Sequence, residues 1–143
     1  MTQENKQLLL KDLCERLPYG VICHYNCVIP IGGIELRKAN CKDVLKGIVP
    51  THDGHICFMV GIDRVNALED DIKPYLRPMS SMTEEEISEF QKRLKIIQDV
   101  EQTLHFCNTV ESIDWLNAHH FDYRGLISMG LALEVPEGMY KND

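Results

Sequence analysis

The segment Met82–Ile87 constrains this chain more than any other, because it fixes where a helix begins. Thr83 followed three residues later by Glu86 forms a capping box, in which each side chain bonds to the backbone of the other. After this start, apolar residues recur every three or four positions through Leu94 as far as Leu104. The spacing predicts one long amphipathic helix of about six turns.

The residues before this helix have the composition of short strands. Val, Ile, Tyr and Cys predominate in 20–28, and weaker strand patterns follow at 33–38 and 64–68. Asp53-Gly54 separates two apolar runs at 43–51 and 56–61, and Asp-Gly is typical of a two-residue hairpin turn. Joined by tight turns, these strands favour a small, strongly bent antiparallel sheet that can close into an SH3-like barrel.

Helical signals flank the predicted sheet on both sides. Residues 3–17 carry an amphipathic pattern that ends at Pro18, and 110–118 predicts a second, short helix. Asp122 can cap a third, which Gly130 would end in the left-handed conformation. We therefore expect an α+β fold with an N-terminal helix, the long amphipathic helix and short C-terminal helices. With 143 residues, we expect a single domain over 1–143, with a helix at 1–18, a β-rich part at 19–79 and a helical part at 80–143.

Charge and hydropathy exclude some classes of partner. Fifteen Lys and Arg against 22 Asp and Glu give a net charge of -7, which disfavours nucleic acid and anionic lipid. Binding of nucleic acid by the sheet would require five basic side chains to gather on one face: Arg37, Lys38, Lys42, Lys46 and Arg64. No apolar run approaches the ~18 residues of a membrane span, and the polar N-terminus is no secretory signal. We expect a cytoplasmic protein without membrane contact.

Six cysteines and six histidines raise the question of a metal site. Without an export signal we expect the cysteines to be free thiols, with Cys23 and Cys27 acting as small buried hydrophobic residues. A zinc site would have to draw on Cys23, His24, Cys27, Cys41, His52, His55 and Cys57. Their spacing lacks two close ligand pairs on tight turns, so we expect no metal and no cofactor.

The segment 115–125 is the densest cluster of polar and aromatic residues. Adjacent histidines followed by an aspartate can serve as acid, base and orienting carboxylate. Equally, Trp, Tyr, His and Arg together suit protein recognition, because such residues dominate interface hot spots. A third interpretation is structural: the aromatic residues pack a helix junction, the aspartate caps a helix and the arginine pairs with a carboxylate. The candidate binding residues are Trp115, His119, His120, Asp122, Tyr123 and Arg124.

Two blocks carry a resemblance to a known family. Lys73–Glu86 (KPYLRPMSSMTEEE) and Asp114–Ile127 (DWLNAHHFDYRGLI), extended by Gly130–Gly138, resemble uncharacterised proteins of gut Bacteroides and their prophages or mobile elements. The resemblance implies a bacterial or phage origin and an intracellular location. It transfers no activity and no catalytic residue.

These observations favour a non-enzymatic binding or accessory module that acts by protein–protein recognition or self-association. The alternative is a small enzyme or ligand-binding protein with a pocket near His119, His120 and Asp122. A deep pocket in which both histidines converge would favour the alternative, and side chains spread over a convex surface would favour the binding module.

Overall fold

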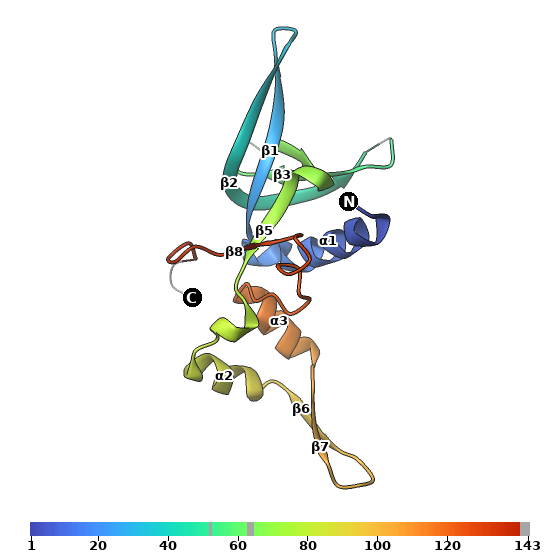
Figure 1. Ribbon diagram of the computed structural model, residues 1–143, viewed down its shortest axis with the longest axis vertical. Coiled ribbons are helices and arrows are strands. Elements are labelled where there is room, and N and C mark those ends of the chain that lie inside the picture. Colours follow the sequence, from blue (N-terminus) through green and yellow to red (C-terminus); the bar gives the residue numbers. More distant parts are fainter. Residues whose placement is uncertain (52, 63–64, 141–143) are drawn as a thin grey trace.

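The computed structural model describes residues 1–51, 53–62 and 65–140. The molecule is α+β and elongated, and a β-hairpin protrudes at each end of its longest axis (Figure 1). Three short 3-10 turns join the regular elements. In chain order the helices and strands are α1 (Gln3–Arg16), β1 (Ile22–Ile31), β2 (Ile34–Pro50), β3 (Ile56–Val60), β4 (Val65–Leu68), β5 (Ile72–Leu76), α2 (Glu84–Gln91), β6 (Lys95–Gln98), β7 (Leu104–Cys107), α3 (Val110–Ala118) and β8 (Leu133–Glu134).

Six strands form one sheet in the order β4-β3-β2-β1-β5-β8. Neighbouring strands are antiparallel except β5 and β8, which pair in parallel through Tyr75 opposite Leu133 and Leu76 opposite Glu134. The prediction of a purely antiparallel sheet is therefore wrong, because the chain returns after α3 to add a strand along β5. Over the described residues the sheet is open, with β4 and β8 at its edges, and no closed SH3-like barrel forms.

The bend of the sheet comes from β2, which has 17 residues. Its register against β1 shifts between Tyr25 and Cys27, and its register against β3 shifts between Leu45 and Gly47. At the first shift Asn40 has a φ of 58°, and its backbone N–H donates to the side chain of Asn26 at 3.0 Å. Bulges of this kind increase the local twist. They direct the outer halves of β1 and β2 away from the sheet as a protruding hairpin (Figure 1).

The hairpin turns form where glycines adopt a positive φ. Gly32 and Gly33, at φ 55° and 81°, form a two-residue turn between β1 and β2. The β2–β3 loop differs from the expected two-residue Asp-Gly turn. The Thr51 N–H donates to the His55 carbonyl at 2.8 Å, so three residues close the loop, and Gly54 takes the left-handed conformation at φ 83°. Of the predicted turn and strand positions, His52 and Arg64 lie outside the described residues.

The core lies between α1 and the sheet. The helix predicted at 3–17 is confirmed as α1, with Thr2 as its N-cap accepting from the Asn5 N–H at 3.1 Å. Cys23 and Cys27 are buried in this core, as predicted, and the six cysteines are free thiols. The largest contributions come from aliphatic and aromatic side chains of α1, the sheet and the C-terminal segment: Leu9, Leu13, Val21, Leu45, Phe58, Val60, Ile72, Leu76 and Leu126.

The long helix predicted to reach Leu104 does not form. The capping box of Thr83 and Glu86 is present as predicted, but α2 ends at Gln91 and the chain continues into the β6–β7 hairpin. A helix of six turns would need an apolar layer along its whole length, and the aromatic contact of α2 lies at its end, where Phe90 stacks on Trp115. The β-branched and aromatic residues beyond it pair with each other instead.

The C-terminal helices are confirmed in part. The helix predicted at 110–118 is α3, capped by Thr109. The helix predicted after Asp122 does not form, because 122–130 is a series of turns, although Asp122 caps its start and Gly130 ends it at φ 76°. The part predicted as helical, 80–143, thus also contains β6, β7 and β8. No helix in the described part of the chain is long and apolar enough to cross a membrane.

Candidate functional site

Three residues of the predicted site segment lie directly beside the end of β5. The Arg77 N–H donates to the His120 carbonyl, and the Asp122 N–H donates to the Arg77 carbonyl, both at 2.8 Å. Arg77 also places its guanidinium over the Phe121 ring, 4.2 Å from the centroid. The segment 120–122 is therefore fixed to the sheet by its backbone.

Arg124 and Tyr123 belong to a partly buried polar network with α1. Arg124 donates to Asp12 at 2.7 Å and to Glu15 at 2.5 Å, and the Tyr123 hydroxyl lies 2.9 Å from Glu15. Asp12 also accepts from the buried Arg16 at 2.8 Å. Asp12 thus lies between two guanidiniums, and these residues join α1 to the C-terminal segment.

His120 occupies an unusual backbone position at the end of α3. Its φ is 64°, and the Phe121 N–H donates to the Leu116 carbonyl at 2.9 Å, the bond that defines a Schellman cap. Glycine is the usual residue there, since a side chain at positive φ costs about 1 kcal/mol. The His120 ring stacks on the Tyr140 ring with centroids 3.6 Å apart, which accounts for a side chain at this position.

Burial lowers the pKa of His120 to about 4. The positive charges of Arg16 and Arg77 and the neighbouring His119 lower the pKa further. The imidazole is therefore neutral at pH 7. It lies 4% exposed between the helix end and the C-terminal tail, out of reach of a ligand in solution.

Trp115 and His119 form the other half of the cluster. The His119 ring lies against the Trp115 ring, with centroids 4.3 Å apart. Trp115 also stacks between Phe90 of α2 and Phe121, each 5.8 Å away. The two histidines thus contact different aromatic partners, His119 on Trp115 and His120 on Tyr140, and their rings do not converge on one site.

All six predicted binding residues therefore have structural contacts. These contacts are the ones that the third, structural interpretation of the segment 115–125 predicts: packing at a helix junction, an aspartate cap and arginine–carboxylate pairs. Asp122 supplies the cap, accepting from the Leu126 and Ile127 N–H groups at 2.8 and 2.9 Å. What the cluster does is hold α1, α2, α3 and β5 together.

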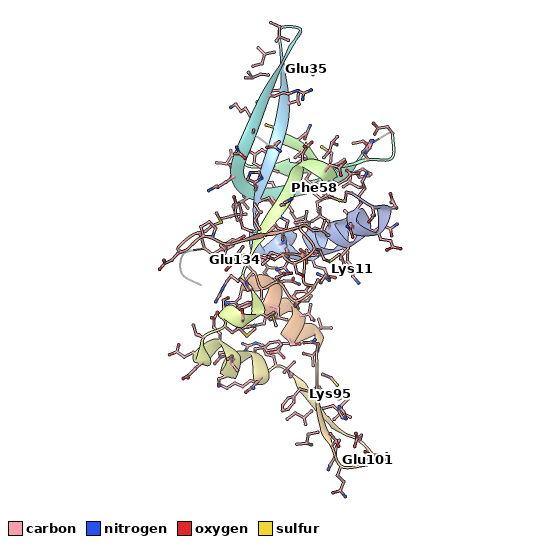
Figure 2. The ribbon with its side chains drawn as sticks, viewed as in Figure 1. Lys11, Glu35, Phe58, Lys95, Glu101 and Glu134 are labelled. Carbon is pink, nitrogen blue, oxygen red and sulfur yellow. The ribbon has the colours of Figure 1, made fainter. Side chains whose placement is uncertain are left out.

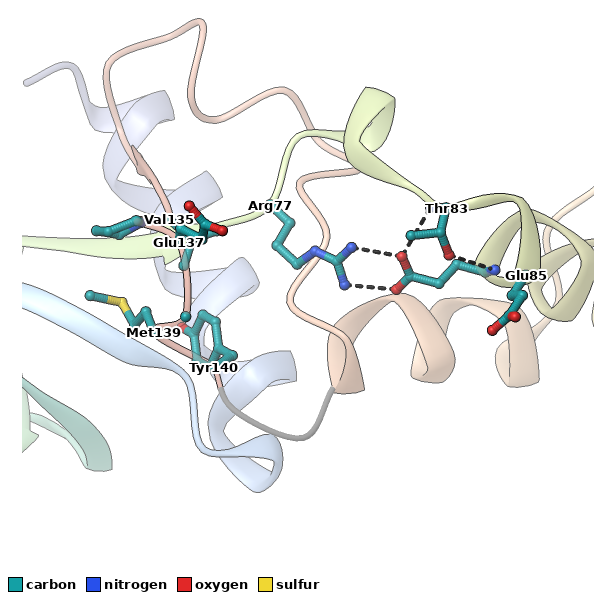
Figure 3. A pocket seen from close by; sticks show the side chains of 10 residues that line it. Arg77, Thr83, Glu85, Val135, Glu137, Met139 and Tyr140 are labelled. Carbon is teal, nitrogen blue, oxygen red and sulfur yellow. Dashed lines mark hydrogen bonds and ion pairs between the residues drawn. The ribbon is translucent and has the colours of Figure 1, made fainter.

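A cavity of about 460 Å³ opens between the start of α2 and the C-terminal tail (Figure 3). On one side of the cavity Arg77 points toward α2 and binds the Glu86 carboxylate with two hydrogen bonds of 2.7 Å. On the other side the C-terminal tail lines the cavity with Val135, Met139 and Tyr140. Arg77 lowers the pKa of Glu86 to about 2. Because Arg77 is already paired with Glu86, it offers little charge to an anionic ligand. His119, His120 and Asp122 do not line this cavity.

A group of exposed apolar side chains lies on the β6–β7 hairpin, residues 95–107, which we call the β6–β7 arm. Ile96 pairs with Phe106 and Gln98 pairs with Leu104, so all four side chains share one face. Ile96, Leu104 and Phe106 are 57%, 58% and 58% exposed. A two-stranded sheet with an uncovered apolar face is marginally stable in water and suits a surface that a partner covers.

The tip of the arm is organised by Asp99. Its carboxylate accepts from the backbone N–H groups of Glu101 and Thr103, both at 2.9 Å, and bonds to the His105 ring at 2.8 Å. The bond to His105 contributes most to lowering the pKa of Asp99. Val100 stands fully exposed at the end of this turn. The arm therefore presents an apolar face behind an acidic tip.

The base of the arm is attached firmly to the helices. The Thr109 hydroxyl donates to the Arg93 carbonyl at 2.7 Å and closes the two strands where they meet α3. Arg93 also lies over the Trp115 ring, 5.9 Å from its centroid. Trp115, predicted as a binding residue, thus supports the arm from beneath.

Most residues considered for a zinc site or for nucleic-acid binding lie on β1 and β2. Among the zinc candidates, His24 bonds to Asn40 and His55 bonds to Glu69, while His52 lies outside the described residues. In the part of the chain that the structure describes, no three His, Cys, Asp or Glu side chains are grouped as metal ligands. Of the five basic residues considered for nucleic acid, four lie on β2 and Arg64 is not described.

Comparisons with protein-family models, with curated proteins and with solved structures found no match for this chain. The candidate surface therefore stands on its geometry alone.

Sequence reasoning missed the β6–β7 arm because its apolar residues also fit a helical spacing. Two signals could have revealed it. Asp99 belongs to a residue type that favours turns, and Leu104–Cys107 lacks strong helix formers after its first residue.

Proposed function

We propose that this protein is a non-enzymatic binding module of bacterial or prophage origin that recognises a partner protein through the β6–β7 arm. The observation that carries the proposal is the exposed cross-strand face of Ile96, Leu104 and Phe106 on a hairpin that no other part of the described chain covers. The sequence blocks 73–86 and 114–127 support the origin.

The arm also indicates what kind of partner would fit. Asp99 and Glu101 lie at its tip (Figure 2 labels Glu101). A matching partner offers an apolar groove for the aliphatic and aromatic face and a basic rim for the acidic tip. Aromatic anchors such as Phe106 contribute most to such interfaces.

The mode of attachment favours recognition over random flexibility. Thr109, Arg93 and Trp115 hold the arm at its base, so the apolar face is presented in a defined direction. A preorganised surface loses less conformational entropy on binding than a mobile loop.

The test is affinity capture with a matched control. Tagged protein is used to capture partners from nuclease-treated lysate of a gut bacterium, alongside the Ile96→Ser/Phe106→Ser variant. The control is Ile62→Ser/Val110→Ser, which replaces two residues that are equally apolar and more exposed but lie outside the arm. We expect a partner that both the wild type and the control retain and the arm variant loses. Equal recovery by all three proteins would refute recognition through the arm.

A further inference from the structure

The β1–β2 hairpin at the opposite end of the molecule has two unpaired edges over residues 27–39, which we call the β1–β2 arm. Pairing of β1 with β5 stops at Tyr25, and pairing of β2 with β3 starts at Leu45. Residues 31–40 are all exposed, and Ile34 at the tip is 74% exposed. Free strand edges are templates for pairing with another strand.

Only the β2 edge can accept a full backbone ladder. The residues on either side of a two-residue turn exchange hydrogen bonds, and such pairs alternate along an antiparallel ladder. Ile34 and Leu36 therefore face β1 with their backbone groups, and the N–H and C=O of Glu35 and Arg37 point away from it. On the β1 edge the outward position 30 is a proline, which has no N–H to donate.

The charges on the β2 edge are complementary to a second copy of the same edge. If two β2 strands pair antiparallel about a two-fold axis at Leu36, each Glu35 lies opposite Arg37 of the partner subunit, twice per dimer. A register centred on Glu35, Arg37 or Lys38 would place like charges opposite each other. Within the described part of the chain, neither Glu35 nor Arg37 forms an ion pair (Figure 2 labels Glu35).

The opposite face of the arm is apolar. Leu36 pairs with Ile29 and Ile34 pairs with Ile31, so four aliphatic side chains share one face of the two strands. Pairing of two copies would join these faces and place Leu36 of both chains side by side at the axis. The same register thus satisfies the outward backbone groups, the charges of Glu35 and Arg37 and the contact between the two Leu36 side chains.

We propose that two copies of this protein associate through antiparallel pairing of their β2 edges, centred on Leu36, to form a four-stranded sheet. This dimer does not depend on the proposed function, because the β6–β7 arm lies at the far end of the molecule (Figure 1). A dimer of this shape leaves two β6–β7 arms free and lets them bind two sites on one partner, which strengthens binding through effective concentration.

The test is a charge-exchange experiment by sedimentation equilibrium of purified protein. We expect the wild type to dimerise, and Glu35→Arg and Arg37→Glu each to weaken the dimer by about tenfold, because each places two like-charge pairs across the axis. An equimolar mixture of the two variants restores opposite charges at both positions and should regain the wild-type affinity. Glu101→Arg, the same change on the other hairpin, should leave the affinity unchanged.

A cross-linking experiment tests the register. Leu36→Cys should form an intermolecular disulfide, located by peptide mass spectrometry, and Ile34→Cys should not, since Ile34 lies opposite Lys38 of the partner subunit. A wild type that stays monomeric at all concentrations overturns the proposal, as does a dimer that both single variants leave intact or a mixture that fails to recover. None of these results depends on whether the β6–β7 arm binds a partner.

Discussion

Acid should destabilise this protein through one buried histidine. His120 has an ordinary pKa of 6.5 that the fold lowers to about 4, chiefly through burial and also through Arg16, His119 and Arg77. Between these two pH values the unfolded chain binds a proton at this position and the folded chain does not. The contribution of His120 to stability is therefore complete above pH 6.5 and is lost as the pH falls toward 4.

The magnitude follows from the two pKa values. At pH 5 the free energy of unfolding is lower than at pH 8 by about 2 kcal/mol because of His120 alone. Below pH 4 this difference approaches about 3 kcal/mol. A loss of this size is a large part of the stability of a small domain.

The assay is urea unfolding at pH 8 and pH 5, followed by the fluorescence of Trp115, the single tryptophan. The comparison protein is His120→Asn, because asparagine tolerates the left-handed conformation and does not titrate. The wild type should lose about 2 kcal/mol more than the variant between the two pH values, while all other titrating groups are common to both. Equal losses in the two proteins would refute the assignment of His120 as a buried neutral group.

Three further substitutions test the contacts that hold the molecule together, each measured by urea unfolding. Tyr140→Phe should cost about 1 to 3 kcal/mol, since the hydroxyl joins backbone groups of β1 and β5, and an unchanged midpoint would contradict that role. Asp12→Ala should cost about 3 to 5 kcal/mol, because it leaves Arg16 and Arg124 without their shared carboxylate; a loss below about 1 kcal/mol would mean that water satisfies them. The wild type should lose stability as the pH falls from 4.5 toward 2, because Glu86 is then protonated, and Glu86→Gln should not show this loss. The same acid profile in both proteins would show that the ion pair does not contribute.

Local signals predicted those parts of the fold in which neighbouring residues settle the structure. The capping box of Thr83 and Glu86 requires only the four residues of one helical turn, and α1 and α3 also follow from their own spacing. The strands around Gly54 follow from the Asp53-Gly54 turn signal between two apolar runs. The loop at Gly54 was nevertheless one residue longer than predicted, because turn type depends on how the flanking strands twist.

Sequence spacing failed where two structures share one pattern. Apolar residues such as Leu94, Ile97 and Leu104 recur at helical intervals, yet Ile97 lies in β6 and Leu104 in β7. The choice between helix and hairpin depends on whether an apolar layer exists for the helix to pack against. That layer is formed by residues far away in the chain and cannot be deduced from the segment itself.

The candidate site shows the same limit. A carboxylate partner for Arg124 was expected, but the identity of Asp12, 112 positions away, requires the fold. His119 and His120 looked alike in sequence, and only the fold separates the half-buried ring on Trp115 from the buried ring on Tyr140.

Photo-crosslinking within bacterial cells tests the central claim, recognition through the β6–β7 arm, most directly. A benzophenone amino acid replaces Phe106 in one strain and Val110, an exposed residue just beyond the arm, in another. Both proteins are irradiated, and the adducts are identified by mass spectrometry. We expect one abundant adduct with a partner protein from position 106 and little of it from position 110. Absence of an adduct at position 106, or equal yields of the same adduct at both positions, would contradict it.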